Sequence, residues 1–351
     1  MSIRPRLVAV AHAVPDQDIH EAFIGWARGR LSDPREAAVF DRMVGRAGIG
    51  HRWSVLPEAD GSPVGPSGFY ARGAMRSTAE RMAVYASAAP ELALRAIDRL
   101  PELGRVTHLV VASCTGFVAP GIDQIIAARL GLAGDVERLL IGFMGCYAGI
   151  TALKAARTIV RSDPDARVLV VAVELSTLHL QAERTLEPLL AMLQFGDGAA
   201  AAIVTAQGAG LALERPFAAT LPDSAALIRW TIGDEGFAMH LSGEVPARLH
   251  AALADPALRP ALTGELTPGD IDGWAVHAGG RSILDAVEQA LTLDRQALAD
   301  SRAVLRDFGN MSSATLLFVM ERMLARAPER GVALAFGPGL AAEGLTFSGI
   351  D

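Results

Sequence analysis

Strand-like apolar runs alternate with helix-like runs along this chain, and this alternation limits its fold more than any other feature. The expected strands are short runs rich in Val, Ile, Leu and Ala, at residues 7–11, 108–112, 139–143, 168–173, 199–204, 274–277 and 332–336. The expected helices carry apolar residues three and four apart, at residues 21–30, 78–100, 123–130, 148–161, 282–291 and 312–326. This pattern predicts βαβ units, and therefore an α/β fold with a largely parallel sheet.

The composition narrows the class of protein. With 351 residues, 51% of them hydrophobic and 20% charged, the chain is long and apolar enough for a substantial core or two domains. A net charge of -7 argues against a broad nucleic-acid surface. Two cysteines make no disulfide framework, no apolar run reaches the roughly 18 residues of a membrane span, and the first residues lack a signal-peptide pattern. We therefore expect a cytoplasmic protein without a membrane span or a nucleic-acid partner.

The chain divides into two halves on sequence grounds. The boundary lies within residues 208–216, where strand character gives way to a stretch that contains proline. This places the N-terminal half at residues 1–214 and the C-terminal half at residues 215–351. Each half has strands that lead into helices through Gly-rich turns, so the halves are coarsely alike.

Cys146 is the first candidate for a reactive side chain. It lies between an apolar run and a helix-like stretch, where helix N-terminal amides favour a thiolate. Gly142, Gly145 and Gly149 keep bulk away from this turn, so that a substrate can approach closely. The more common role of a single cysteine is that of a small buried hydrophobe, and this alternative stays open at this point.

His277 and Asn310 occupy the same kind of place as Cys146. His277 ends a strand and precedes two glycines and a helix, and Asn310 lies at the start of another helix. Because strand ends in an open parallel sheet share one rim, the three side chains can converge. Taken singly, His277 could be a buried structural histidine and Asn310 a helix N-cap. No histidine pair has metal-binding spacing and no Cys-x-x-Cys occurs, so we expect no metal site.

Five short motifs follow one another along the chain: GCYAG at 145–149, FGDGAA at 195–200, HAGG at 277–280, GNMSSA at 309–314 and GPGL at 337–340. In this order they resemble the motifs of the type III polyketide synthases, the chalcone/stilbene synthase-like enzymes of the thiolase fold. The resemblance implies two similar βαβαβ-type halves in a five-layered αβαβα core. Ketoacyl synthases share the Cys-His-Asn trio, but Gln-Ala-Asn usually follows their histidine, where this chain has Ala278-Gly279-Gly280.

The resemblance also implies a reaction. A starter acyl group passes from coenzyme A to Cys146, and malonyl-CoA then condenses with it through decarboxylation. His277 pairs with Cys146 as imidazolium and thiolate, and His277 and Asn310 donate hydrogen bonds to the malonyl thioester oxygen as it becomes an enolate. No metal or redox cofactor is expected.

The cavity differs from that of plant relatives. Phe195 matches a phenylalanine that guards the junction of the coenzyme A tunnel and the cavity, whereas Met239 replaces the second guarding phenylalanine. Trp230 stands where chalcone synthases have glycine. Three further cavity positions, occupied by small hydroxyl residues in those enzymes, are Cys114, Ser176 and His179. Core packing is the alternative role for Phe195.

Coenzyme A phosphates are expected at Arg42 and Arg46, which lie four apart on one helix face. A third cationic position of the relatives is Val39 here, so the patch is depleted, and a merely solvated face is the alternative. The residues expected along the pantetheine arm are Gly279, Gly280 and Ser312. Relatives are homodimers, and Ala119 matches the position that reaches into the neighbouring cavity.

The starter is the least constrained part of the prediction. The pocket is most similar to those of bacterial alkylpyrone and alkylresorcinol synthases, which favours a fatty acyl-CoA. The alternatives are a tetrahydroxynaphthalene or phloroglucinol synthase that uses malonyl-CoA alone, a ketoacyl-ACP synthase III-like enzyme, and a non-catalytic partner subunit of the same fold.

Overall fold

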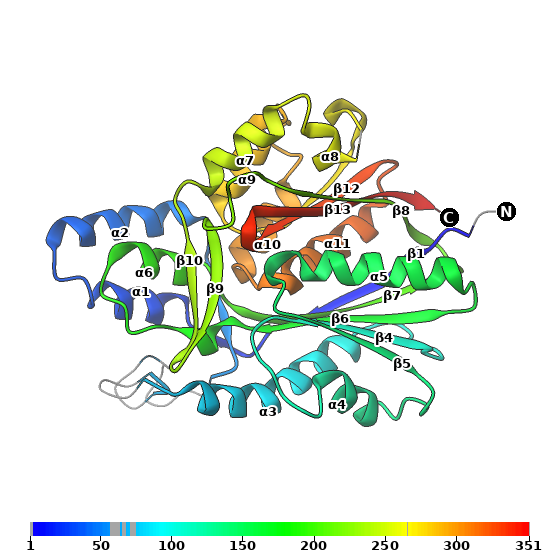
Figure 1. Cartoon of the computed structure of the whole chain (residues 1–351), viewed down its shortest axis with the longest axis horizontal. Coiled ribbons are helices and arrows are strands. Elements are labelled where there is room, and N and C mark those ends of the chain that lie inside the picture. The colour runs from blue at the N-terminus through cyan, green and yellow to red at the C-terminus, as the bar shows by residue number, and fades with distance from the viewer. Residues whose placement is uncertain (1–2, 57–63, 65–67, 71–74, 265, 351) are drawn as a thin grey trace.

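The computed structural model describes residues 3–56, 64, 68–70, 75–264 and 266–350 (Figure 1). Its strands are β1 (Arg6–Ala13), β2 (Gln17–Asp18), β3 (Trp53–Ser54), β4 (His108–Ser113), β5 (Glu137–Gly142), β6 (Arg167–Leu175), β7 (Asp197–Thr205), β8 (Gly210–Thr220), β9 (Ile228–Gly233), β10 (Gly236–Leu241), β11 (Gly273–Val276), β12 (Gly331–Gly337) and β13 (Ala341–Ile350). Its helices are α1 (His20–Arg28), α2 (Pro34–Ala47), α3 (Thr78–Ile97), α4 (Ile122–Arg129), α5 (Ala148–Ser162), α6 (Leu186–Met192), α7 (Val245–Ala254), α8 (Arg259–Thr263), α9 (Arg281–Ala290), α10 (Ala299–Phe308) and α11 (Thr315–Arg326).

The main sheet runs in the order β11-β12-β13-β8-β1-β7-β6-β4-β5 through the described part of the chain. Only β11–β12, β4–β6 and β4–β5 pair in parallel, and the other neighbours are antiparallel. The prediction of a largely parallel sheet is therefore wrong. One physical reason lies between β12 and β13, where residues 338–340 are too few for a crossover and so return the chain antiparallel.

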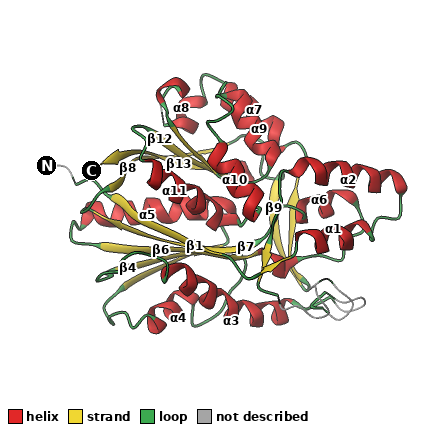
Figure 2. Ribbon diagram, turned by 180° about the vertical axis from the view of Figure 1, so that it is seen from behind, coloured by secondary structure: helices red, strands yellow, loops and turns green. Residues whose placement is uncertain are grey.

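Helices and strands form five layers, as the resemblance implies (Figures 1 and 2). Helices α3 and α4 cover one outer face, over β4, β6, β7 and β1, and α7 and α9 cover the other, over β8 and β11–β13. Helices α5 and α11 lie between the two parts of the sheet. In β6, Val168 and Val170 belong to the central core, whereas Leu169 and Val171 pack toward α3. A strand buried on both faces explains the continuous apolar run.

The strand break expected within residues 208–216 is wrong, because β8 continues from Gly210 to Thr220. Pro216 pairs with Leu345 of β13, while Leu211 and Ala212 of β8 pair with β1. The other edge of β8 is unpaired at Pro216, and proline is tolerated on such an edge because it lacks only the N–H. The division into residues 1–214 and 215–351 stays a prediction.

Candidate active site

The structure brings Cys146, His277 and Asn310 together in the wall of one cavity. Cys146 lies in the 3-10 turn η1 (Gly145–Tyr147) between β5 and α5, and His277 directly follows β11. Asn310 follows α10 and precedes the turn η4 (Ser312–Ala314). The three residues are far apart in the sequence, and their side chains meet where β5, β11 and α10 end.

Close backbone packing holds the segment of Cys146 against the turn η4, which follows Asn310. A Cβ atom on Gly149, in the first turn of α5, would lie 2.2 Å from the carbonyl oxygen of Ser313. Gly145 has φ +78°, and a Cβ atom there would lie 2.4 Å from Pro338. These glycines therefore allow a contact between η1, η4 and the end of β12 that other residues would block.

Asn310 uses both ends of its amide. Its Oδ1 accepts from the backbone N–H of Ser312 at 2.8 Å, and its Nδ2 donates to the carbonyl of Gly279 at 3.2 Å. The first contact is the cap-like bond that the sequence left open as an alternative. Because Oδ1 accepts this bond, Nδ2 is the end of the amide that can donate a hydrogen bond. Asn310 can therefore make the capping bond and still act as a hydrogen-bond donor.

Burial favours the neutral forms of both the Cys146 thiol and the His277 ring. Burial raises the pKa of the Cys146 thiol to about 11, although the polar side chains of Ser312 and Asn310 oppose the rise. Burial lowers the pKa of His277 to about 3, and neither ring nitrogen has a hydrogen-bond partner in the described part of the chain. Burial therefore opposes the expected thiolate–imidazolium pair, and that pair stays a prediction.

Glu174 is a buried carboxyl near the nucleophile that the sequence argument missed. It accepts hydrogen bonds from the Cys114 N–H, from the Thr115 hydroxyl at 2.8 Å and from the Ser313 hydroxyl. Burial raises the pKa of Glu174 to about 7 despite these donors, and its charge raises the pKa of Cys146. A carboxylate that ends a continuous apolar strand is the sequence signal that could have found it.

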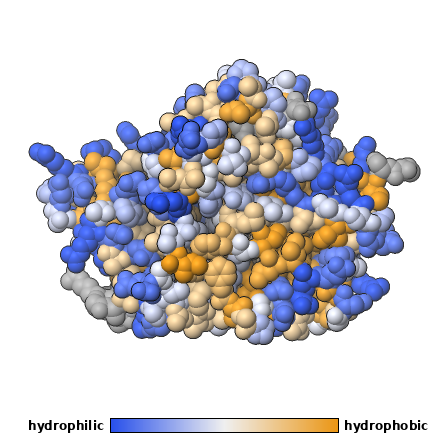
Figure 3. Space-filling view, in the orientation of Figure 1, coloured by the Kyte–Doolittle hydropathy of each residue, from blue (hydrophilic) through white to orange (hydrophobic). Residues whose placement is uncertain are grey.

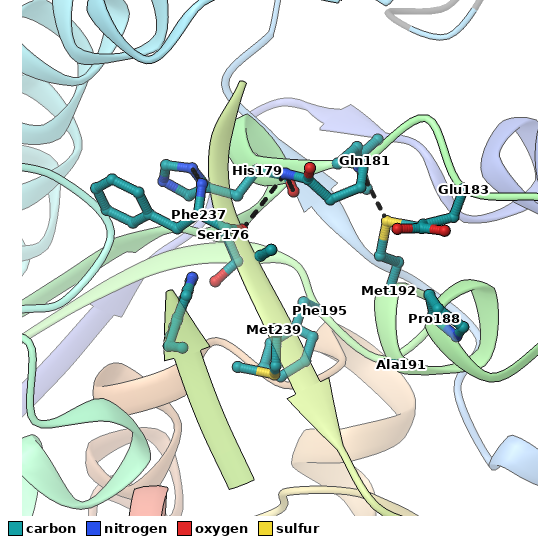
Figure 4. Close-up of a pocket in the computed structure, with 13 residues that line it drawn as sticks. Ser176, His179, Gln181, Glu183, Pro188, Ala191, Met192, Phe195, Phe237 and Met239 are labelled. Atoms are coloured by element: carbon teal, nitrogen blue, oxygen red, sulfur yellow. Dashed lines mark hydrogen bonds between the residues drawn. The ribbon is translucent and has the colours of Figure 1, made fainter. Parts of the chain in front are cut away.

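Phe195, Trp230 and Met239 form a wall between the Cys146 cavity and a second one. Trp230 on β9 pairs directly with Met239 on β10, and Phe195 and Met239 project into the second cavity (Figure 4). The two cavities hold 530 and 610 Å³ of empty space, open mouths included. The wall therefore separates the chamber of Cys146 from a second chamber.

The second cavity contains two of the three other predicted cavity residues. Ser176 and His179 line it, both from the turn η2 (Ser176–His179). His179 accepts from the Phe237 N–H at 3.1 Å, hydrogen-bonds the Thr115 carbonyl at 2.7 Å and stacks on the Phe237 ring, while burial lowers its pKa to about 3. Cys114 lines neither cavity: it is fully buried, and its sulfur accepts from the Gly145 N–H at 3.0 Å.

The predicted coenzyme A residues fall into two groups. Arg42 and Arg46 are exposed on α2, and Arg46 lines a separate surface cavity together with Arg281. Arg281 was missed by the sequence argument, although it directly follows Gly279 and Gly280. Gly279 lines the Cys146 cavity, and a Cβ atom on Gly280 would lie 2.2 Å from the Gln194 side chain.

Two of the predicted site residues, Ser312 and Ala119, do not line either of the two cavities. Ser312 is fully buried and close to the Cys146 sulfur, so it does not lie along the cavity wall where the pantetheine arm was expected. Ala119 is exposed in the loop after β4 and lines neither cavity of its own chain. Among the described residues, no group of His, Cys, Asp and Glu forms a candidate metal site, and no helix is long and apolar enough to cross a membrane.

Comparison with known proteins identifies the family of this chain. Residues 6–208 match the N-terminal domain of chalcone and stilbene synthases, and residues 212–351 match the C-terminal domain. The chain is 34% identical to type III polyketide synthase A of Arabidopsis thaliana, over 76% of this chain and 73% of the relative. It is also 34% identical to the alpha-pyrone synthesis polyketide synthase-like Pks18 of Mycobacterium tuberculosis, over 74% of this chain and 69% of the relative.

Solved structures show the same fold. PKS-I from the brown alga Ectocarpus siliculosus superposes with a TM-score of 0.88 and 28% identity, covering 100% of this chain and 99% of that one. The C-terminal type III polyketide synthase domain of Steely1 from Dictyostelium superposes with a TM-score of 0.87 and 25% identity, covering 99% of this chain and 100% of that one. The chain thus belongs to the chalcone and stilbene synthase family and is an acyltransferase of the type III polyketide synthase class.

Proposed function

We propose that this synthase loads a fatty acyl-CoA starter on Cys146, extends it with malonyl-CoA and cyclises the chain to an alkylpyrone or alkylresorcinol. The observation that carries the proposal is the shared cavity of Cys146, His277 and Asn310, with a second chamber behind Phe195, Trp230 and Met239. Pks18, a relative named for alpha-pyrone synthesis, supports the pyrone product. Family members use CoA thioesters, which fits a cavity that leads to the nucleophile.

Loading requires Cys146 to give up its proton. His277 is neutral and both its ring nitrogens are unpartnered among the described residues, so it can accept that proton as the sulfur attacks the starter thioester. The bond between the acyl carbon and the coenzyme A sulfur then breaks, and coenzyme A leaves as the thiol with a proton returned by His277. The starter remains as a thioester on Cys146.

Extension uses the hydrogen-bond donors of the same cavity. The carbon–carbon bond to the malonyl carboxylate breaks, carbon dioxide leaves, and the electron pair forms an enolate whose oxygen accepts from Asn310 Nδ2 and His277. The enolate carbon attacks the starter thioester, and the Cys146 sulfur leaves as a thiolate. Asn310 is prepared for this role because its Oδ1 is already occupied by the Ser312 N–H.

Coenzyme A phosphates are assigned to Arg42, Arg46 and Arg281. No hydrogen bond or ion pair of the Arg42 and Arg46 guanidinium groups occurs among the described residues, so both cations are free to meet an anion. Arg281 shares the Arg46 cavity, and its Nη1 donates to the Arg46 carbonyl at 3.2 Å. Asp285 lies in the same cavity and pairs both with Arg281, at 3.5 Å, and with Arg302, at 2.7 Å. Because Asp285 is shared with Arg302, we infer that Arg281 can still contact a phosphate and take the place of the cation missing at Val39.

The synthase is proposed to act as a homodimer. Strand β5 is the outermost strand of the main sheet, and its Leu139 and Leu140 are each 44% exposed. Phe117, in the loop that also carries Ala119, is 49% exposed, and apolar side chains gather on this face in Figure 3. An exposed edge strand with an apolar patch is typical of a surface that a second copy covers.

Incubation with malonyl-CoA, alone and with acyl-CoAs from acetyl to palmitoyl, followed by mass spectrometry, tests the proposal. Pyrones or resorcinols that form only with a long-chain starter support it, and a product from malonyl-CoA alone reassigns the enzyme to the tetrahydroxynaphthalene or phloroglucinol type. Cys146→Ala should abolish acyl loading. Asn310→Ala should keep loading but slow malonyl-CoA decarboxylation by about 10²–10³-fold.

A further inference from the structure

Arg52 is a fully buried cation beside the active site that no step above uses. Its Nε donates to His20 Nδ1 at 3.0 Å, and its Nη1 donates to the carbonyls of Met192 and Phe195 at 3.1 and 3.0 Å. Its guanidinium carbon lies 4.4 Å from the centre of the Phe23 ring. Since burial of a cation is costly unless its geometry is well satisfied, the position of Arg52 calls for an explanation.

The segment that Arg52 holds is bonded directly to the backbone of Asn310. The Asn310 N–H donates to the Gln194 carbonyl at 2.8 Å, and the Gly196 N–H donates to the Asn310 carbonyl at 3.0 Å. Phe195, between these two bonds, forms an isolated β-bridge with Asn310. The backbone of the wall residue Phe195 and that of the donor Asn310 are therefore one paired unit.

Arg52 also touches the other side of this unit. Gly309 precedes Asn310 with φ +70°, and a Cβ atom on it would lie 2.9 Å from Arg52 Cγ and 3.0 Å from the Gln194 carbonyl oxygen. The aliphatic stem of Arg52 thus packs against residue 309, while its guanidinium bonds the carbonyl of residue 195. One side chain thus contacts Phe195 of the bridge and the residue that directly precedes Asn310.

The polar groups around Arg52 hold it in place without a direct ion pair. The Arg52 backbone N–H donates to Asp18 Oδ1 at 3.1 Å, and Asp197 accepts from the Val55 and Thr177 N–H groups. Both carboxylates favour the guanidinium charge electrostatically. His20, which accepts from Arg52, is neutral because burial and the adjacent cation lower its pKa to about 4. Its Nη2 is buried without a hydrogen-bond partner in the described part of the chain, so Nε and Nη1 make the hydrogen bonds of the guanidinium.

We propose that Arg52 is a positioning residue, which fixes Phe195 and Asn310 relative to each other for decarboxylation of the malonyl unit. The inference rests on the proposed function. Displacement of a catalytic donor by about 1 Å can cost about 10²-fold in rate. Acyl loading needs Cys146 and His277, and neither residue belongs to the paired unit that Arg52 contacts. Arg52 therefore acts mainly on decarboxylation and less on acyl loading.

The test compares two rates in the full-length enzyme: acylation of Cys146 by an acyl-CoA, followed by intact-protein mass spectrometry, and decarboxylation of malonyl-CoA. In Arg52→Lys, which keeps the charge but cannot reach all three acceptors, decarboxylation should fall at least about tenfold and acylation less than about threefold. Arg167→Lys is the matched control. Arg167 also donates to two backbone carbonyls, those of Leu103 and Glu102. It is the first residue of β6, however, and so lies at the other end of that strand from Glu174. Both rates should stay unchanged in it.

A ratio of the two rates equal to that of the wild type, whether both fall or neither does, overturns the inference. If Arg52→Lys does not fold, His20→Ala takes its place, because it removes the Nε acceptor and leaves the cation; an unchanged ratio there overturns the inference equally. If the wild-type enzyme neither loads an acyl group nor decarboxylates malonyl-CoA, the proposed function itself fails, which is a different result.

Discussion

Gly149→Ala should destabilise the enzyme, although alanine is the better helix former. Gly149 lies in the first turn of α5, and its new Cβ atom would be 2.2 Å from the Ser313 carbonyl oxygen and 3.2 Å from the Ser313 carbonyl carbon. Non-bonded carbon atoms prefer about 3.5–4.0 Å. Because the obstacle is backbone rather than a flexible side chain, α5 and η4 must move apart by roughly 1 Å.

Two opposing magnitudes decide the sign. Alanine is favoured over glycine in a helix interior by about 0.8–1.0 kcal/mol. Overpacking of a closely packed site costs about 1–3 kcal/mol. A backbone contact of 2.2 Å belongs at the upper end of that range, so we expect a net loss of about 1–2 kcal/mol in the free energy of unfolding.

Gly25→Ala is the matched control, because Gly25 is exposed within α1 and a Cβ atom added there would have no heavy atom within 4 Å. Here only the helix preference acts, and the stability should rise by about 0.5–1 kcal/mol. Urea unfolding of both variants measures the difference. Product formation should fall at least about tenfold in Gly149→Ala, because η4 carries Ser312 next to Cys146. Equal urea midpoints for the two variants would refute the packing argument.

Three other predictions follow from the site. Arg281→Ala should raise the KM for malonyl-CoA about fivefold, which corresponds to a loss of about 1 kcal/mol in binding. The KM for malonyl-pantetheine, which lacks the phosphates that Arg281 would contact, should stay unchanged. Equal effects on both substrates would exclude a phosphate contact. Trp230→Gly removes part of the wall between the chambers and should lengthen or change the products, and an unchanged product profile by mass spectrometry would place Trp230 outside the path. Burial raises the pKa of Glu174 from 4.5 to about 7, so the folded state holds an extra proton between these values and loses stability as pH rises through them. Glu174→Gln should remove this contribution, at most about 1.4 kcal/mol per pH unit, and an identical pH slope in thermal unfolding would contradict it.

The sequence predicted the positions of elements better than their directions. Helix α3, expected at residues 78–100, spans Thr78–Ile97, and the strand expected at residues 108–112 is β4. The direction of a strand depends on the connection that leads into it. In addition, strands of the antiparallel part of the sheet, such as β8 and β13, lack a strong apolar pattern because they are partly exposed. The short turn before β13 reverses the chain, which a pattern of apolar runs does not reveal.

The trio of reactive residues could be predicted because each lies at the end of an apolar run or at the start of a helix-like run, whereas the protonation of Cys146 and His277 could not. The position of Cys146 at a helix start favoured a thiolate, but burial raises its pKa to about 11. Burial is a property of the assembled core, to which distant segments contribute. Glu174 and Arg281 were missed for a related reason: they become relevant only when β6 lies under η4 and α9 lies beside α2.

The opposite pKa shifts of Cys146 and His277 have the same leading cause, since removal of water penalises whichever form is charged. Burial therefore favours the neutral pair, and the thiolate–imidazolium pair is favoured by the attraction between its own two charges. The polar side chains of Ser312 and Asn310 both lower the thiol pKa, Ser312 more than Asn310. A displaced Asn310 leaves the contribution of Ser312 in place, whereas the enolate loses one of its two donors. For this reason the contacts that Arg52 makes beneath residues 195 and 309 bear more on extension than on loading.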